Sequence, residues 1–203
     1  MDLDEALQRR RMVRSFDGSA VDEEQLTKLF EESLRAPTAG NARGISWVLG
    51  IGSPAVRDYF LASTDATWRS NSARFAGLAR ASAVALCVME PDRYVQRYGE
   101  SDKVSSGLGS DPSAWPLPYW VGDAGAATMA ALLLLEAQGL SASFLGAFRN
   151  HNEIQDAFAL PRAQQIYGAV LIGRPDNGDH RSPSLDRPGP SRSERVVRYR
   201  SQA

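Results

Sequence analysis

The longest apolar run of the chain covers residues 125–135, where small side chains are followed by leucines. Asp123 before the run and Gly139 after it are typical of helix ends, so the pattern predicts a helix whose first turn Asp123 caps. No face of this helix is polar, and we expect it to be covered on all sides, by its own sheet and by a second copy of the chain. The run is shorter than the ~20 apolar residues that a bilayer requires, so we expect a buried helix and no membrane partner.

The rest of the chain alternates between helical and extended patterns. Helices are expected at residues 2–12, 21–36, 54–62, 72–80, 91–98 and 152–160, and strands at 45–51, 83–89, 141–148 and 165–172. Residues 101–118 are rich in Gly, Ser and Pro, as in a lid or flexible cover. The Pro/Arg/Ser-rich end is either disordered or laid across a partner.

Composition limits the class of protein. With 203 residues, 43% of them hydrophobic, the chain can fill one core, and we expect a single domain over residues 1–203 with an extended tail from about 181. A net charge of -1 argues against nucleic acid as a partner. The acidic residues Asp2, Asp4 and Glu5 stand where a signal peptide needs positive charge, so we expect a cytoplasmic protein.

Arginines gather just after the first expected helix. Arg9, Arg10, Arg11 and Arg14 lie within six residues of one another. Such a cluster repels itself unless solvent or an anion separates the charges, and the guanidinium fork matches phosphate oxygens. The cluster therefore has two interpretations, a phosphate site and a solvated helix end.

Two loops carry candidate binding side chains. Residues 37–44 combine small and amide side chains, which suit hydrogen bonds to a polar ligand edge but also occur in ordinary surface turns. The segment before the long helix ends in Trp115, Tyr119 and Trp120, which are suited either to rim a flat apolar ligand or to cap the core helix. Neither loop decides the function alone.

The turn after the strand at 45–51 matches a dinucleotide fingerprint. Gly50, Gly52 and Ala55 follow the pattern G-x-G-x-x-A, which in an NAD(P) dehydrogenase turns the chain against a pyrophosphate. That fold also needs a second buried strand ending in an acidic residue about 20 positions on, and residues 63–69 show none. We interpret the match as a tight strand-to-helix turn.

The chain shows no pattern of conventional catalytic or metal-binding side chains. Cys87 lies inside an apolar strand, where a thiol is typical of the core, and it excludes an intrachain disulfide because it is alone. His151 and His180 stand apart from acidic or cysteine clusters, so no metal site is expected, and no G-x-S-x-G elbow occurs.

Three segments together resemble the FMN-dependent nitroreductases. Residues 10–16 resemble the basic opening motif of that family, and residues 36–43 resemble its second motif. Residues 115–123, 139–140 and 144–146 are similar to a bacterial branch of the family, and residues 168–173 and 181–185 match it too. The chain departs from the usual pattern at Met12 (often Ser), Arg43 (usually Gln), Gly44 (commonly Pro) and 189–190 (often arginines).

The resemblance implies an α+β fold with a central, mostly antiparallel sheet flanked by helices, in an intertwined homodimer that holds two FMN at its interface. Arg10, with Arg11 as a possible second donor, would contact the phosphate, and Arg14 the ribityl and pyrimidine side. Gly146 and Ala147 would lie against the ring with their backbone. The other implied cofactor-binding residues are Met12, Pro37, Thr38, Ala39, Asn41, Arg43, Arg187 and Arg192, of which Thr38, Ala39 and Asn41 would reach the flavin from the other subunit.

The implied activity is an oxidoreductase that takes a hydride from NADH or NADPH and reduces a nitroaromatic, quinone or similar flat small-molecule acceptor by a ping-pong mechanism. Flavin is the redox centre in such enzymes, so no catalytic side chain is assigned. Trp115, Tyr119 and Trp120 would line the acceptor pocket. The alternatives are a flavin-binding storage or sensing relative without turnover, and the NAD(P) dehydrogenase that would use Gly50, Gly52 and Ala55.

Overall fold

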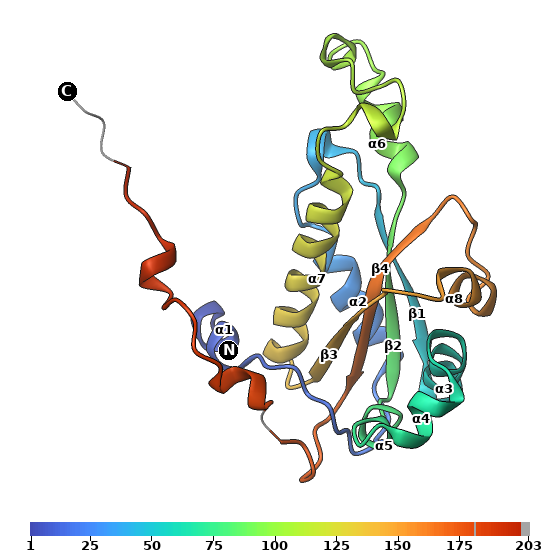
Figure 1. The fold of residues 1–203 in the computed structure, drawn as a ribbon, viewed down its shortest axis with the longest axis vertical. Helices are drawn as coiled ribbons and strands as arrows, with labels where there is room; N and C mark the ends of the chain where they lie inside the picture. Colours follow the sequence, from blue (N-terminus) through green and yellow to red (C-terminus); the bar gives the residue numbers. More distant parts are fainter. Residues whose placement is uncertain (181, 200–203) are drawn as a thin grey trace.

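The computed structural model describes residues 1–180 and 182–199, and a four-stranded sheet forms the centre of this part of the chain (Figure 1). All neighbouring strands pair antiparallel, in the order β1-β2-β4-β3. Their bounds are β1 Ile45–Ile51, β2 Ala83–Met89, β3 Ser141–Gly146 and β4 Gln165–Gly173. The expected α+β fold around an antiparallel sheet is confirmed.

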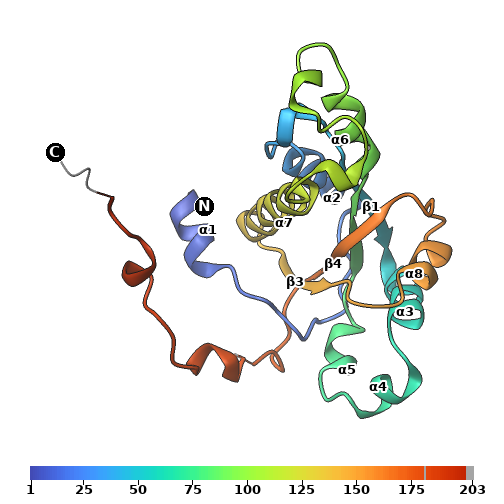
Figure 2. The ribbon, with the colours of Figure 1, turned by 45° about the horizontal axis from the view of Figure 1, so that its top comes forward.

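Helices cover both faces of the sheet (Figures 1 and 2). The helices α2 (Glu23–Ser33) and α7 (Tyr119–Ala137) pack on one face, and α3 (Gly52–Ser63) and α8 (His151–Ala157) pack on the other. Side chains along β2 alternate between the two faces. Ala83 and Ala85 pack on the side of α2 and α7, and Val84 and Leu86 pack on the side of α3 and α8. The central strand β2 is therefore apolar and buried at every position.

Four shorter helices complete the N-terminal half of the chain, and two of them, α1 and α4, begin at a side-chain cap. These are α1 (Leu3–Arg9), α4 (Ala66–Asn71), α5 (Phe75–Leu78) and α6 (Pro91–Tyr98). The expected bounds of α6 are confirmed, whereas the helix expected at 72–80 is shorter and α4 precedes it. The cap of α4 is Asp65, whose carboxylate accepts the amide hydrogen of Trp68 at 2.6 Å.

The long helix α7 begins earlier than its sequence pattern predicts. It starts at Tyr119, directly after Pro118, so Asp123 lies inside the helix and is not its N-cap. One stripe of α7 is buried in the chain, but Val121 and Met129 on another side remain 39% and 37% exposed. By length and composition alone this helix could cross a membrane, yet it packs against α1, α2 and all four strands, as a core helix does.

The N-terminal segment runs along the outer edge of the sheet before it reaches α2. Met12 forms a parallel bridge with Ala142 of β3, and Val13 donates its amide hydrogen to the Ala142 carbonyl at 2.9 Å. The ring of Phe16 is fully buried against the layer of α3 and α8. This route carries the arginine cluster to the free edge of β3.

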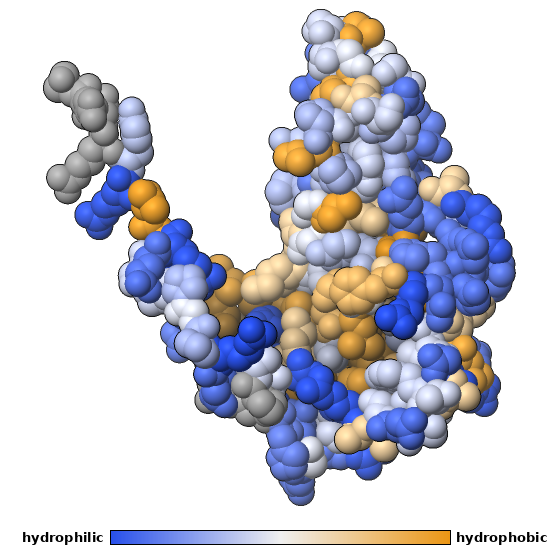
Figure 3. Space-filling model, in the orientation of Figure 1, coloured by the Kyte–Doolittle hydropathy of each residue, from blue (hydrophilic) through white to orange (hydrophobic). Residues whose placement is uncertain are grey.

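The described part of the tail, residues 182–199, runs away from the sheet (Figure 1). Its apolar side chains Val196, Val197 and Tyr199 are at least 75% exposed. In Figure 3, further apolar side chains gather in the hollow between the tail and the helical body. A single chain leaves this apolar surface uncovered.

Candidate functional site

Arg10 is the most unusual side chain of the basic cluster. It is the C-cap residue of α1 and donates its amide hydrogen to the Ala6 carbonyl at 2.9 Å. Within the described residues, its guanidinium atoms Nε and Nη1 are buried and have no hydrogen-bond partner. Buried charged donors are normally paired, so this guanidinium fits an anionic group from outside the chain.

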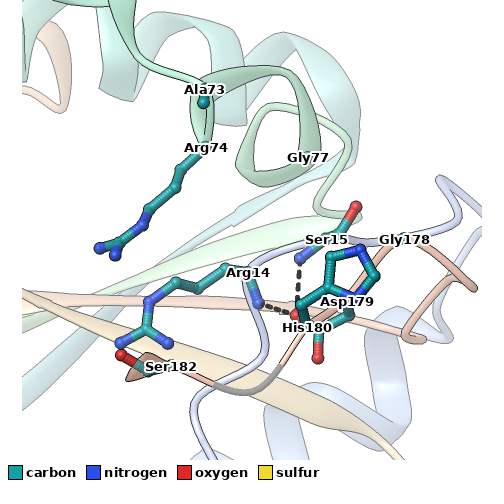
Figure 4. A pocket seen from close by; sticks show the side chains of 9 residues that line it. All are labelled: Arg14, Ser15, Ala73, Arg74, Gly77, Gly178, Asp179, His180 and Ser182. Atoms are coloured by element: carbon teal, nitrogen blue, oxygen red, sulfur yellow. Dashed lines mark hydrogen bonds between the residues drawn. The ribbon is translucent and has the colours of Figure 1, made fainter. Parts of the chain in front are cut away.

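Arg14 lines a cavity of about 220 Å³ at the same edge of the sheet (Figure 4). Its amide hydrogen is accepted by Asp179 Oδ1 at 2.6 Å, and the same oxygen accepts the amide hydrogen of Ser15 at 3.2 Å. These bonds fix the backbone and leave the Arg14 guanidinium in the cavity, where it donates to the Met12 carbonyl at 3.5 Å. Arg74 lines the same cavity, and the sequence pattern did not identify it.

Arg11 and Met12 have protein partners of their own. Arg11 forms an ion pair with Asp179, whose carboxylate side chain is 1% exposed. Met12 Sδ accepts the amide hydrogen of Phe144 at 3.3 Å, which ties the N-terminal segment to β3. Cofactor contacts by either residue stay predictions. The Arg11 guanidinium already has a charged partner within the chain.

Gly146 and Ala147 lie where β3 ends. Gly146 pairs with Gly168 of β4, and Ala147 donates its amide hydrogen to the Tyr167 carbonyl at 3.3 Å. A Cβ atom at Gly146 would come within 2.6 Å of the Phe148 ring, so a larger residue here would displace this exposed ring. The backbone here lies on the same strand that Met12 joins.

The second group of predicted residues forms a strained turn before β1. Gly40, Asn41 and Arg43 have φ angles of +60°, +57° and +51°, in the left-handed region that is unfavourable for an arginine. Thr38 stabilises the turn, because its carbonyl accepts the Asn41 amide hydrogen at 2.8 Å and its Oγ1 accepts that of Arg43 at 3.0 Å. A cavity of about 510 Å³ opens here, and its lining includes Pro37, Thr38, Asn41, Arg43 and Asp123.

Asp123 ties this turn to the body of the protein. Its Oδ2 atom accepts the amide hydrogen of Ala39 at 2.8 Å and the hydroxyl hydrogen of Tyr94 at 2.9 Å. Burial raises the pKa of the Tyr94 hydroxyl, and the hydrogen bond to Asp123 raises it further, so Tyr94 remains a donor. The prediction that Asp123 caps α7 was wrong. An aspartate before an apolar run is typical of an N-cap, and the sequence does not reveal that its acceptor serves residues from distant segments.

We expect Asp123→Ala to destabilise the protein by about 1–3 kcal/mol, because it leaves the Ala39 amide and the Tyr94 hydroxyl without their acceptor. The amide oxygen in Asp123→Asn can still accept both hydrogen bonds, so that variant should lose much less. Urea unfolding of both variants measures the difference. Equal stabilities for Asp123→Ala and the unsubstituted protein would show that the tie contributes nothing.

The three predicted pocket aromatics differ in exposure. Trp115 and Trp120 are 7% and 6% exposed and pack with Tyr94 in the core, with ring centroids 6.1 and 5.7 Å from the Tyr94 ring. Tyr119 is 50% exposed and packs at 6.1 Å from the Trp115 ring. In a single chain, only Tyr119 offers a ring face to a ligand, and the pocket role of all three stays a prediction.

The two groups of predicted residues lie near opposite ends of α7. Arg9 Nε lies 3.6 Å from Glu136 near the end of the helix, whereas Ala39 is bonded to Asp123 near its start. Thirteen helical residues at a rise of 1.5 Å separate these two anchors by about 20 Å. The cavities that contain Arg14 and Arg43 share no lining residue. Within one chain, the structure therefore keeps the arginine cluster at β3 apart from the turn before β1, although the residues of each group lie together.

The remaining candidates lie outside these cavities. Arg187 and Arg192 are exposed on the tail, so their cofactor role stays a prediction. Burial raises the pKa of the Cys87 thiol to about 12, as expected for a core residue. At the Gly50 turn, Gly52 has a φ of +84° and opens α3, and β1 pairs antiparallel with β2, so this is the expected strand-to-helix turn.

Comparison with known proteins assigns the family. A model of the nitroreductase family matches residues 7–174. The chain belongs to the nitroreductase family. This membership supports an oxidoreductase function and agrees with the resemblance of residues 10–16 and 36–43. No curated protein was found to match the sequence.

Solved structures share the fold of this nitroreductase-family chain at low sequence identity. A nitroreductase from Lactococcus lactis in complex with nicotinic acid has a TM-score of 0.73 and 15% identity, with 98% of this chain and 100% of that chain covered. A putative nitroreductase from Exiguobacterium sibiricum in complex with FMN has a TM-score of 0.68 and 18% identity, with 92% and 95% covered. A putative NADH oxidase from Clostridium acetobutylicum has a TM-score of 0.60 and 19% identity, with 88% and 90% covered.

Proposed function

We propose that this chain is a cytoplasmic, FMN-dependent oxidoreductase, active as a homodimer, that takes electrons from NADH or NADPH and reduces flat acceptors such as nitroaromatics and quinones. The observation that carries the proposal is that Arg10 Nε and Nη1 are buried without a hydrogen-bond partner among the described residues of a nitroreductase-family chain. A phosphate monoester is an anion that a guanidinium can contact through two parallel hydrogen bonds. FMN carries such a phosphate, and the Exiguobacterium relative was solved with FMN.

The residues at the free edge of β3 fit one end of the cofactor. Arg10 holds the phosphate, and Arg14 reaches the ribityl and pyrimidine side from its cavity. Gly146 and Ala147 offer backbone without a bulky side chain where the ring lies. Bound FMN supplies the redox chemistry, so the protein has to bind and orient the reactants rather than provide a nucleophile.

A second copy of the chain completes the site. The strained turn that includes Thr38, Ala39 and Asn41 lies about 20 Å along α7 from the arginine cluster, too far to share one ligand pocket with it. A two-fold partner placed on the open face of α7 brings the turn of one chain to the arginines of the other. It also covers the apolar residues Val121 and Met129.

The tail and the aromatics take supporting roles in this proposal. Arg187 or Arg192 closes over the phosphate. The exposed tail then packs against the cofactor site. Tyr119, backed by Trp115 and Trp120, forms a wall of the acceptor pocket. Nicotinic acid in the Lactococcus relative is a flat heteroaromatic ligand, which supports a pocket for flat molecules.

Steady-state kinetics test the proposed activity. If donor and acceptor occupy one site in turn, the initial rate with NADH or NADPH at several fixed menadione or nitrobenzoate concentrations should give parallel double-reciprocal lines. Intersecting lines would show that both substrates bind together and would contradict the shared site. No turnover with any donor and acceptor pair would favour a flavin-binding protein without this activity.

A further inference from the structure

A further cavity, of about 380 Å³, opens between α3, α4 and α5, the helices that Figure 2 shows away from α7. It shares no lining residue with the cavities that contain Arg14 and Arg43. Its volume lies within the range of ~300–1,000 Å³ that is usual for small-molecule sites. The proposed oxidoreductase activity gives this cavity no role, so its ligand has to be inferred from its own walls.

Aromatic side chains form the apolar wall of this cavity. Phe60 of α3 is buried, and the partly buried Phe75 of α5 stands at 88° to it, with the ring centroids 5.3 Å apart. Trp68 of α4 supports both rings, because its centroid lies 6.4 Å from that of Phe60 and 6.0 Å from that of Phe75. Leu61, which is 56% exposed, continues the wall toward solvent. Two rings at right angles form a corner that suits a third flat ring.

The cavity is positively charged, since two of its described lining residues are arginines and none is acidic. Arg69 Nη1 donates to the Phe60 carbonyl at 3.1 Å and to Thr64 Oγ1 at 3.2 Å, which fixes its guanidinium at the end of α3. No carboxylate among the described residues pairs with Arg69. Arg57 pairs with its sequence neighbour Asp58, but both side chains are more than half exposed, so water weakens that pair. The positive charge therefore favours a ligand with an anionic group.

We propose that this cavity binds an aromatic monocarboxylate, with its ring against Phe60 and Phe75 and its carboxylate at Arg57 and Arg69. A guanidinium can contact a carboxylate through two parallel hydrogen bonds. A neutral aromatic ring would leave both cations without a partner, and a small inorganic anion would leave the apolar wall exposed to water. The site is separate from the proposed FMN site, so this inference goes beyond the proposed function and does not depend on it.

The test is calorimetric titration of the full-length protein, in the presence of saturating FMN, with 2-naphthoate and with the neutral 2-naphthylmethanol. The carboxylate should bind at least about tenfold more tightly than the alcohol, because only the carboxylate pairs with the guanidiniums. Arg57→Gln should weaken 2-naphthoate binding about fivefold, and it spares Arg69, whose bonds hold the end of α3. Arg93→Gln is the matched control, because Arg93 is exposed on α6 and also pairs with a nearby acid, Glu90.

A further variant, Tyr119→Leu, separates this cavity from the proposed acceptor pocket, which also suits flat molecules. Weaker 2-naphthoate binding by Arg57→Gln, with unchanged binding by Arg93→Gln and Tyr119→Leu, would support the inference. If Tyr119→Leu weakens binding and Arg57→Gln does not, the acid occupies the acceptor pocket, and the inference is overturned while the proposed function stands. Absence of binding, or equal affinities for the acid and the alcohol, would overturn the inference as well.

Discussion

Replacing Arg10 by alanine is expected to weaken FMN binding roughly 10- to 150-fold. The variant removes a charge-assisted contact to the phosphate worth about 1.5–3 kcal/mol. The prediction depends on the Arg10 Nε and Nη1 atoms, which are buried without partners in the described chain. A fluorescence titration of the apoprotein with FMN measures the change.

The same variant should behave differently without the cofactor. Burial of Nε and Nη1 without partners is unfavourable in the free chain, so Arg10→Ala should not destabilise the apoprotein toward urea. Arg9→Ala is the matched control, because Arg9 is exposed and pairs with Glu5 at 3.2 Å. Equal FMN affinities for Arg10→Ala and Arg9→Ala would remove Arg10 from the phosphate site.

Met129→Glu is expected to abolish the dimer at micromolar concentration and to remove FMN with it. Met129 is 37% exposed in a single chain, so a glutamate there could reach solvent and the isolated fold should tolerate it. At the centre of an interface made by two copies of α7, the same carboxylates would be desolvated close to each other.

Sedimentation velocity with detection at the flavin absorbance band measures both effects. Leu61→Glu is the matched control, since Leu61 is 56% exposed on α3, on the opposite face of the sheet from α7. That variant should remain a dimer with bound FMN. A Met129→Glu protein that sediments as a flavin-bearing dimer would place the interface elsewhere.

Much of the fold could be predicted from local pattern. The structure confirms the expected bounds of β1 and β2. The strand β2 is buried at every position and therefore admits no polar residue, whereas the edge strand β1 is only partly buried after Ile45 but is still mostly apolar. The helix α4 was missed, since it is only six residues long, mostly polar, and set by a single cap at Asp65. Short helices of this kind depend on packing, in this case of Trp68 against Phe60 and Phe75, more than on periodicity.

Site residues could be predicted where they belong to one contiguous segment of the sequence. The basic cluster and the turn before β1 are contiguous motifs, so their residues could be named from the sequence. Arg74 could not, because its proximity to Arg14 requires the approach of α5 at Gly77. For the same reason Asp123 was assigned to a local cap, although its partners Ala39 and Tyr94 come from two other segments.

The visible spectrum of the purified protein, recorded without oxygen before and after addition of NADPH or NADH and then of menadione, tests the central claim most directly. The account predicts a yellow protein with one FMN per chain, loss of the absorbance near 450 nm on addition of the nicotinamide, and its return with menadione. A colourless protein that takes up no added FMN would contradict the proposed cofactor. A yellow protein whose flavin absorbance neither nicotinamide changes would contradict the proposed oxidoreductase activity.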